Sequence, residues 1–543
     1  MKTNLFTRLA LLAAAFVLFS CSFAGRYTPH NIGPYDARPA GAIPSDDIKP
    51  EDFNTNEFDH ITDNPFLRPR ENPLSTFSID VDTAGYPIVR TLIKRHELPP
   101  PSSVRIEELI NYFDYDYPPP DDGRPFAVRS ETGVAPWNPQ HLLARIAIKG
   151  KEFPVAGRPP VNLTFLLDVS GSMDYPNRLP LVKQAMAMLT EGLNAQDRVS
   201  ICVYAGAAGT VLRPTGGDKK QQIMAALKKL NAGGSTAGGA GIQLAYKLAQ
   251  ENFNPAAVNR VILCTDGDFN VGITNRSDLV DLIKKKADTG VYLTVLGFGM
   301  DNYHDGTLKQ LATKGNGNYG YIDTIEEAHK MLVRQMSGTL VTIANDVKIQ
   351  VEFNPAAVGA YRLIGYENRL LRAEDFNDDT VDAGDIGAGH TVTAFYEIIP
   401  PGTEADALPG VDPLRYAVQR DAGDAAAIFA DELCTVKIRY KLPGETASNL
   451  ISFPIKTQDI RKAGETSTDF NFAASVAAFG MLLRDSPYKG SADFDMVLNM
   501  AESSFGTDEY GYRRRFYQLA LDARGVNWSK EWRKRWIEAG GEE

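Results

Sequence analysis

From residue 160 onward the chain alternates between short apolar runs and longer runs whose apolar residues recur at helical spacing. Val161–Leu167 is apolar except for Asn162 and Thr164, which is typical of a strand covered on both faces. Arg178–Leu193 has the spacing of an amphipathic helix. This rhythm continues to about residue 342 and predicts βαβ units in a doubly wound, mainly parallel sheet. The other predicted strands are Val199–Val203, Val258–Cys264 and Val291–Phe298, and the other predicted helices are Gln221–Leu230, Gly241–Ala249, Leu279–Ala287, Thr307–Thr313 and Ile325–Leu340.

The segments on either side of this α/β domain (160–342) have different patterns. Residues 73–159 show strand and helix patterns between proline-rich breaks, which predicts a small N-terminal α+β module. The period-two alternation of Val347–Phe353 opens a region that is β-rich to about residue 440, and the chain is helical from about residue 469. We therefore expect an α/β fold with a small α+β module before it and a C-terminal domain, 343–543, that is β-rich and then helical.

The N-terminus has the pattern of an export signal. Lys2 and Arg8 precede the apolar run Leu9–Phe19, which is too short to span a bilayer. The following Leu18-Phe19-Ser20-Cys21 resembles the lipobox of bacterial lipoproteins. That resemblance implies a signal peptide at 1–20 and a lipid on Cys21. Residues 22–72 are rich in Pro, Asn, Asp and Gly and show no sustained periodicity, which predicts a flexible linker, so that anchor and linker span 21–72. The lipobox resemblance places the protein in the bacterial cell envelope, exported and lipid-anchored to a membrane. The alternative is an ordinary secretory signal with a chance cysteine.

Charge and cysteine content narrow the classes of partner. The 543 residues carry a net charge of -11, and removal of residues 1–20 takes away two basic residues and no acid, which gives -13. A chain this acidic is a poor match for nucleic acid, whose phosphates need clustered Lys and Arg. Apart from Cys21, the cysteines are Cys202, Cys264 and Cys434. We expect three buried, inert thiols, with one disulfide as the alternative.

Three loops carry the candidate chemistry. Asp168-Val169-Ser170-Gly171-Ser172 stands at the carboxyl end of the first predicted strand, where open α/β sheets bind ligands. A Gly-rich loop before a helix offers Thr236, and the loop after another strand offers Asp266. Carboxylate and hydroxyl oxygens are hard ligands that suit Mg²⁺ or Mn²⁺. A serine-rich turn, with Ser170 or Ser172 as a helix N-cap, is the alternative for the first loop alone.

These loops resemble the von Willebrand factor type A (VWA) domain and its metal-ion-dependent adhesion site. The family pattern D-x-S-x-S, then T, then D, matches Asp168, Ser170, Ser172, Thr236 and Asp266. The resemblance implies that these five residues hold Mg²⁺ (or Mn²⁺) and that a partner protein supplies an Asp or Glu carboxylate. Two flanking segments also resemble a bacterial family of exported von Willebrand A proteins with domains of their own, namely Thr76–Ala84 with Arg105–Phe113 on the N-terminal side and Asp385–Ala394 on the C-terminal side.

The preferred hypothesis is therefore a membrane-tethered, metal-dependent protein-binding lipoprotein that serves in adhesion or as a scaffold and is not an enzyme. No general base is paired with a nucleophile near the metal motif. One alternative is a Mg²⁺-dependent hydrolase or phosphatase, because Asp80-Val81-Asp82-Thr83 resembles the start of haloacid-dehalogenase-like phosphatases. A further alternative is an envelope scaffold whose metal site is purely structural.

Overall fold

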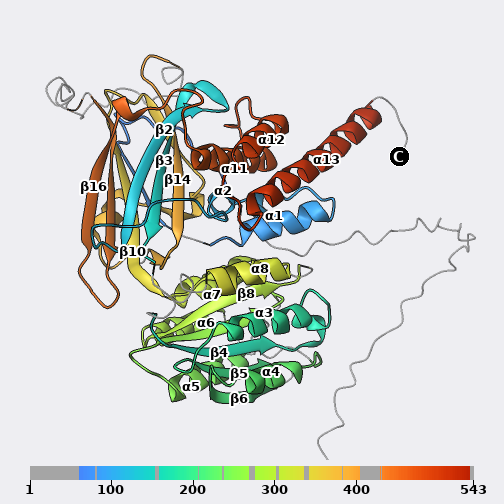
Figure 1. The fold of residues 1–543 in the computed structure, drawn as a ribbon. Helices are drawn as coiled ribbons and strands as arrows, with labels where there is room; N and C mark the ends of the chain where they lie inside the picture. Colours follow the sequence, from blue (N-terminus) through green and yellow to red (C-terminus); the bar gives the residue numbers. More distant parts are fainter. Residues whose placement is uncertain are drawn as a thin grey trace, which may run out of the picture. The chain divides into compact units, whose positions relative to one another are not determined.

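A computed structural model describes most of the chain (Figure 1). The contacts between residues divide the chain into Met1–Phe53 and Asn54–Glu543, and all of the described residues belong to the second unit. The predicted export signal, Cys21 and residues 22–59 of the predicted linker lie outside the described residues. The linker prediction is wrong for residues 60–72, because Leu67 pairs with Tyr361 and the Asn64 side chain donates to the carbonyl of Gly365 at 2.8 Å. The described ranges are 60–79, 82–152, 158–205, 207–234, 238–267, 276–300, 305–335, 341–381, 383–403, 429 and 431–538.

A six-stranded sheet forms the core of the α/β domain predicted at 160–342, which is called the VWA domain below after the family that its loops resemble. The strand order is β6-β5-β4-β7-β8-β9, and every neighbouring pair is parallel except β5 with β6. The central strand β4 is buried along its whole length, as its apolar sequence predicts. The predicted mainly parallel sheet is therefore confirmed. The strands are β4 (Val161–Asp168), β5 (Arg198–Tyr204), β6 (Ala208–Gly216), β7 (Val258–Thr265), β8 (Val291–Phe298) and β9 (Tyr319–Ile322).

Helices cover both faces of this sheet (Figure 1). Because successive strand residues point to opposite faces, Phe165 packs into the core on the α3 side, whereas Leu166 packs into the core on the α5 side. The sheet is thus buried between two helical layers, and its strand ends are the places where polar loops can gather. The helices are α3 (Leu179–Glu191), α4 (Lys220–Lys228), α5 (Gly238–Glu251), α6 (Arg276–Ala287), α7 (Asp305–Lys314) and α8 (Ile325–His329).

Three elements of the VWA domain differ from the sequence prediction. Strand β6 was not predicted, because its nine residues are half-exposed and include arginine, proline and glycine. Strand β9 was not predicted, because it is only four residues long. The predicted helix Ile325–Leu340 is shorter in the structure, since α8 ends at His329 and a π-helical turn follows at Lys330–Arg334. The last residues of that prediction, 336–340, lie outside the described part of the chain.

Segments from both sides of the VWA domain build two antiparallel sheets together. The first has the order β12-β1-β10-β15-β16, with β13 also paired to β10, and the second has the order β11-β14-β3-β2. The rings of Phe353 and Tyr361 stack 3.7 Å apart between the two sheets. The strands are β1 (Leu74–Ser78), β2 (Phe126–Ala135), β3 (Asn138–Gly150), β10 (Thr342–Phe353), β11 (Ala360–Ile364), β12 (Leu370–Leu371), β13 (Gly384–Gly387), β14 (Thr391–Ile399), β15 (Glu432–Lys441) and β16 (Asn449–Lys456).

This pairing changes the meaning of the flanking segments. The sequence pattern predicts a module at 73–159 and a separate domain at 343–543, but β1 pairs with β10, and β3 pairs with β14. The physical reason is that the strands of 73–159 need partners for their open edges, and these partners lie about 200 residues or more further along the chain. The VWA domain is thus an insertion between β3 and β10 of one β-sandwich.

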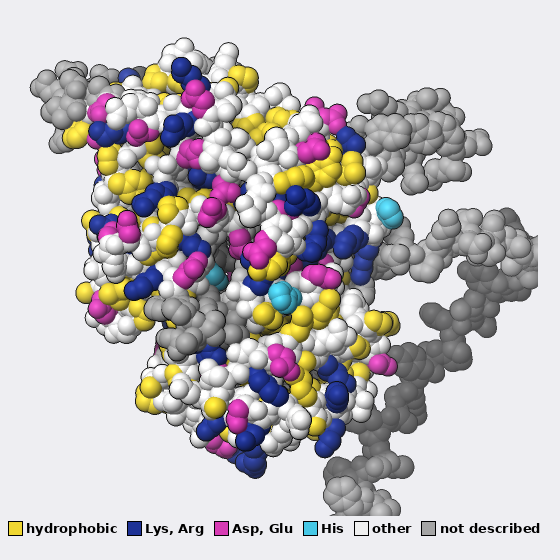
Figure 2. All heavy atoms as spheres, viewed as in Figure 1, with side chains coloured by type: hydrophobic (Ala, Val, Ile, Leu, Met, Phe, Trp, Pro, Cys, Tyr) yellow, Lys and Arg dark blue, Asp and Glu magenta, His cyan; other side chains and the backbone are white. Residues whose placement is uncertain are grey.

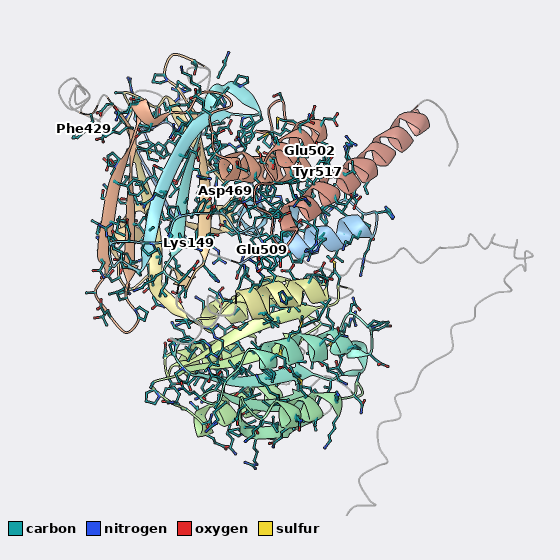
Figure 3. All side chains as sticks on the ribbon, viewed as in Figure 1. Lys149, Phe429, Asp469, Glu502, Glu509 and Tyr517 are labelled. Carbon is teal, nitrogen blue, oxygen red and sulfur yellow. The ribbon has the colours of Figure 1, made fainter. Side chains whose placement is uncertain are left out.

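The helices of the flanking segments form a second apolar core. Phe113, Phe472 and Phe516 pack edge to face in it, with ring centroids 4.9–5.6 Å apart. Helix α1 contacts α13, and α2 contacts α11 (Figure 1). Asp469, labelled in Figure 3, lies in the first turn of α11 and pairs with Arg513 of α13 at 2.5 Å. The helices are α1 (Gly85–Lys94), α2 (Ile106–Ile110), α11 (Thr468–Arg484), α12 (Phe494–Ser503) and α13 (Tyr512–Glu538).

Buried ion pairs join the flanking helices to the VWA domain. The guanidinium of Arg90 in α1 lies 2.5 Å from Asp323 and 2.7 Å from Glu327. On the neighbouring contact, Lys309 of α7 lies 2.7 Å from the carboxylate of Glu108 in α2. Because all five side chains are largely buried, these pairs fix the VWA domain against α1 and α2.

The surface is mixed in charge. On the face seen in Figure 2, acidic and basic side chains are interspersed, with apolar side chains between them. Among the described residues, no helix is both long enough and apolar enough to cross a membrane.

Candidate metal centre

The Asp168 loop and the Asp266 loop meet at the carboxyl ends of two adjacent parallel strands. Asp168 is the last residue of β4, and Asp266 directly follows β7. Because β4 and β7 pair in register through Leu167 and Cys264, the two loops emerge side by side. The sheet therefore brings together two of the predicted carboxylates, which are separated by almost a hundred residues in the sequence.

Asp168 is fully buried, and hydrogen bonds hold its carboxylate. Its Oδ1 accepts from the backbone N–H of Ser170 at 2.9 Å, and its Oδ2 accepts from the Tyr204 hydroxyl at 2.9 Å. Burial raises the pKa of Asp168 to about 6, and the nearby Asp266 adds to this rise. Oδ2 also accepts from the Thr265 hydroxyl at 3.3 Å. A divalent cation beside the group would favour its charged form.

The two serines of the motif face each other rather than capping a helix. Their Oγ atoms lie 3.0 Å apart. Ser170 occupies the N-cap position of the short 3₁₀ turn Gly171–Met173, but its side chain makes no capping hydrogen bond. The N-cap alternative for Ser170 is therefore not supported. Ser170 is buried and Ser172 is exposed, so the site opens to solvent on the Ser172 side.

The backbone ties the Gly-rich loop to the Asp168 loop. The N–H of Gly171 donates to the carbonyl of Gly234 at 3.0 Å, and the N–H of Gly233 donates to the carbonyl of Val169 at 2.8 Å. Gly234 has φ +91°, a conformation that glycine adopts without strain. Thr236, the predicted ligand of this loop, lies outside the described residues. Its loop nevertheless begins beside the two serines.

Asp266 provides the observation against which a metal can be tested. Its Oδ2 lies 3.1 Å from Nη1 of Arg178. Its Oδ1 is buried and has no hydrogen-bond partner within the described part of the chain. A buried carboxylate oxygen without a partner costs on the order of 1–3 kcal/mol or more, and a bound ion is one of its ordinary explanations. Asp266, Asp168 and the serine hydroxyls are hard oxygen donors, so these residues fit Mg²⁺ or Mn²⁺.

Arg178 belongs to the same site and was not predicted from the sequence. Its Nη1 also donates to the carbonyl of Ser172 at 2.6 Å, and its guanidinium lies 4.9 Å from the centre of the Tyr175 ring. Arginine is not a metal ligand, so a search for ligand patterns passes over it. Its position is set by the close approach of Gly299, which makes room for it and is visible only in the folded structure.

Other candidate residues stand apart from this site. Asp80, the nucleophile of the phosphatase alternative, lies outside the described residues. Within the described ranges, no group of three or more His, Cys, Asp or Glu side chains forms another metal-binding cluster. The expectation of three buried thiols is confirmed for Cys202, Cys264 and Cys434. Burial raises the thiol pKa of Cys202 and of Cys434 to about 12, which makes both poor nucleophiles at neutral pH.

The fold and the loops define a VWA-domain protein. The family model described as "von Willebrand factor type A domain" matches residues 162–335, the model "von Willebrand factor" matches 52–145, and the model "Uncharacterized protein YfbK, C-terminal" matches 338–526. VWA domains are typically non-catalytic binding domains that contact protein partners, often through a metal site.

The chain belongs to the YfbK family. It is 42% identical over 479 residues to "Uncharacterized protein YfbK" of Escherichia coli (strain K12), and the alignment covers 87% of this chain and 82% of that protein. The predicted resemblance to a bacterial von Willebrand A family with its own flanking domains is thereby confirmed.

Two further comparisons are more distant. "Uncharacterized protein sll0103" of Synechocystis sp. (strain ATCC 27184 / PCC 6803 / Kazusa) is 30% identical over 338 residues, which is 61% of this chain and 74% of that protein. The solved structure "von Willebrand factor type A from Catenulispora acidiphila" is 17% identical with a TM-score of 0.39, and the match covers 76% of this chain and 97% of that one.

Proposed function

We propose that this protein is a membrane-tethered binding module that takes an Asp or Glu carboxylate of a partner protein at a Mg²⁺ or Mn²⁺ site. Asp168, Ser170, Ser172, Thr236 and Asp266 would hold the metal. When bound, the metal supplies a Lewis-acidic centre that accepts a carboxylate oxygen. The residues of this chain orient the loops and leave the Ser172 side open to solvent.

The buried, unpartnered Oδ1 of Asp266 is the observation that carries this proposal. Burying this carboxylate oxygen without a hydrogen bond costs free energy of folding, which a hydroxyl or amide donor beside it would reduce. Its neighbours are oxygen donors rather than a paired base and nucleophile, which favours ligand binding over hydrolysis. The exposed Ser172 supports access by a partner from outside.

The proposed address is the bacterial cell envelope, with a lipid on Cys21 holding the molecule to a membrane. The apolar run Leu9–Phe19 and the cysteine directly after Ser20 support this part of the proposal. Metabolic labelling with a clickable fatty acid tests it in the wild type and in Cys21→Ser. Loss of the label in Cys21→Ser is expected, and an unlabelled wild type would contradict the lipid anchor.

Metal binding is tested by titrating Mn²⁺ into the metal-free protein and measuring free Mn²⁺ by electron paramagnetic resonance. We expect one bound Mn²⁺ in the wild type, competition by Mg²⁺, and loss of binding in Asp168→Ala. Asp174→Ala is the matched control, because it removes an exposed carboxylate from the same loop. Absence of Mn²⁺ binding in the wild type would refute the metal site.

Partner binding is tested by affinity capture from envelope extract with immobilised wild type, Asp168→Ala and Asp174→Ala, each with Mg²⁺ or with chelator. The proposal expects a partner that is captured by the wild type and Asp174→Ala only when Mg²⁺ is present. If the same partner is captured equally with chelator and by Asp168→Ala, binding through the metal is refuted. Metal binding without any metal-dependent capture would favour the scaffold with a purely structural metal site.

A further inference from the structure

Arg178 is a buried cation built into the candidate metal centre. Its side chain is only 8% exposed, and its Nη1 bridges two of the loops, from the carbonyl of Ser172 at 2.6 Å to Oδ2 of Asp266 at 3.1 Å. Burying an arginine is costly unless it is paired. The partner of Arg178 is Asp266, which is also a proposed ligand of the metal.

The surrounding residues hold the guanidinium in this place. Gly299 has φ +71°, and a Cβ at that position would lie 2.4 Å from Nε of Arg178. The end of β8 therefore makes room for the arginine by having no side chain. On the other side, the ring of Tyr175 lies 4.9 Å from the guanidinium carbon and is itself 58% exposed. Arg178 is thus fixed between the sheet edge and the surface.

The charges at the site show what this arginine does. Asp168 and Asp266 together carry two negative charges when ionised, which a divalent cation alone would cancel. Arg178 adds a positive charge that cannot be removed by deprotonation near neutral pH. Among the buried charged side chains of the two loops and Arg178, the metal-loaded set therefore has one surplus positive charge, which an incoming carboxylate neutralises. Asp174 of the first loop is exposed, so solvent screens its charge.

We infer that Arg178 is a specificity-determining residue, which weakens metal binding and strengthens the binding of an anionic ligand to the loaded site. This inference rests on the proposed function. Its physical basis is Coulombic, because a fixed cation within a few ångströms repels a divalent ion and attracts a carboxylate, and both effects are larger at a buried position than in water. The arginine selects for a carboxylate against neutral oxygen ligands, such as a hydroxyl or an amide.

The test measures two affinities that should move in opposite directions. Mn²⁺ binding is followed by electron paramagnetic resonance, and acetate binding to the Mn²⁺-loaded protein is followed by the relaxation rate of water protons. In Arg178→Gln we expect roughly tenfold tighter Mn²⁺ binding and roughly tenfold weaker acetate binding than in the wild type. Arg178→Lys keeps the charge, so it should retain most of the acetate binding.

Arg213→Gln is the matched control. It removes the same charge from an exposed position on β6, five residues beyond Ala208 and so roughly 16 Å further along the strand. Its two affinities should equal those of the wild type. Urea unfolding of each metal-free variant reports whether the variant is folded. If Arg178→Gln has a folding defect, Arg178→Met takes its place, because it removes the charge and keeps an unbranched side chain, and the same two opposite changes are expected.

The outcomes separate this inference from the proposed function. If the wild type binds Mn²⁺ and loses it in Asp168→Ala, but Arg178→Gln has unchanged affinities, the role of Arg178 is refuted and the metal site stands. Parallel weakening of Mn²⁺ and acetate in Arg178→Gln would also refute it, because that is the result of a merely structural role. If the wild type binds no Mn²⁺, the proposed function fails, and this inference fails with it.

Discussion

Two buried aspartates at opposite ends of the same sheet differ in how their oxygens are used. Asp197 lies at the amino end, just before β5, and is fully buried. Arg158 donates to both of its oxygens, at 3.0 and 2.6 Å, and the backbone N–H groups of Val161 and Asn194 complete the set. Asp266 lies at the carboxyl end, and among the described residues only one of its oxygens is engaged, by a single arginine nitrogen.

The two ends of the sheet therefore have different purposes. The closed pair of Arg158 and Asp197 has bidentate geometry and satisfied oxygens, as expected of a purely structural ion pair. The open pair of Arg178 and Asp266 leaves an oxygen for something outside the fold. Counting partners, oxygen by oxygen, distinguishes a structural ion pair from a ligand site, although both involve a buried arginine and a buried aspartate.

The strongest test of this contrast compares Asp197→Asn with Asp266→Asn. Asp197→Asn leaves Arg158 buried without its counter-charge, so we expect a loss of roughly 3–5 kcal/mol in the free energy of unfolding. Asp266→Asn also removes the counter-charge of Arg178, but it weakens a single hydrogen bond and relieves the repulsion between Asp266 and Asp168. We therefore expect a smaller loss, about 1–2 kcal/mol, in the metal-free protein. Urea unfolding without metal measures both values. Equal losses would contradict the distinction between a closed pair and an open pair.

Gly299→Ala tests whether the open end depends on the placement of Arg178. The added Cβ would clash with Nε of Arg178, and φ +71° is unfavourable for alanine. We expect a loss of about 1–3 kcal/mol in the free energy of unfolding, together with a change in Mn²⁺ affinity in the same direction as in Arg178→Gln. Gly209→Ala, where a Cβ meets nothing within 4 Å, is the control. An unchanged Mn²⁺ affinity in Gly299→Ala would mean that Arg178 can move without consequence.

The ion pair of Arg158 and Asp197 should also contribute to how the free energy of unfolding changes at low pH. Burial alone would raise the pKa of Asp197, but the hydrogen bonds from Arg158 and from the backbone lower it below the ordinary value of 3.8. Its stabilising contribution is therefore fully present above pH 3.8 and is lost as the pH falls below that value. Unfolding curves between pH 5 and pH 2 should show a smaller loss of stability in Asp197→Asn than in the wild type. Identical slopes would contradict this assignment.

The smallest expected effect is on the thiols between the two ends of the sheet. Cys202 in β5 and Cys264 in β7 are buried and should not react with iodoacetamide in the native protein. Asp266→Asn should leave them unreactive, because Asp266 holds few contacts of the sheet. Asp197→Asn should speed their labelling, because it removes an ion pair that stabilises the sheet. Mass spectrometry of tryptic peptides measures both rates. Fast labelling of the native wild type would show that the sheet is not closed between its ends.

The metal loops could be predicted from the sequence because each ligand stands directly after an apolar strand or before a helix. Asp168 and Asp266 follow β4 and β7, and parallel pairing brings such positions to one edge. Arg178 could not be predicted, because its place depends on a glycine at the end of β8, 121 residues further along the chain. Contacts of this kind follow from the packed fold and leave no local pattern.

The flanking segments were harder for a similar reason. Their strands were predicted where the period-two alternation is clear, as in β10. Their partners were not predicted, since alternation reveals which face is buried and says nothing about which strand lies alongside. Pairing β1 with β10 required skipping the whole VWA domain, and no local signal in either strand records that choice.

The insertion of the VWA domain also shapes how the sandwich can fold. Strand β3 ends at Gly150, where a Cβ would lie only 2.9 Å from Cδ1 of Ile343 in β10, so the two ends of the insertion are neighbours. An unfolded insert of roughly 190 residues would have to be closed as one long loop, at about 3 kcal/mol more than a short turn of a few residues. Once the VWA domain is folded, its own termini hold β3 and β10 together. The folded VWA domain thus holds β3 and β10 close enough to join the sandwich, and we expect the two sheets to form only after the VWA domain has folded.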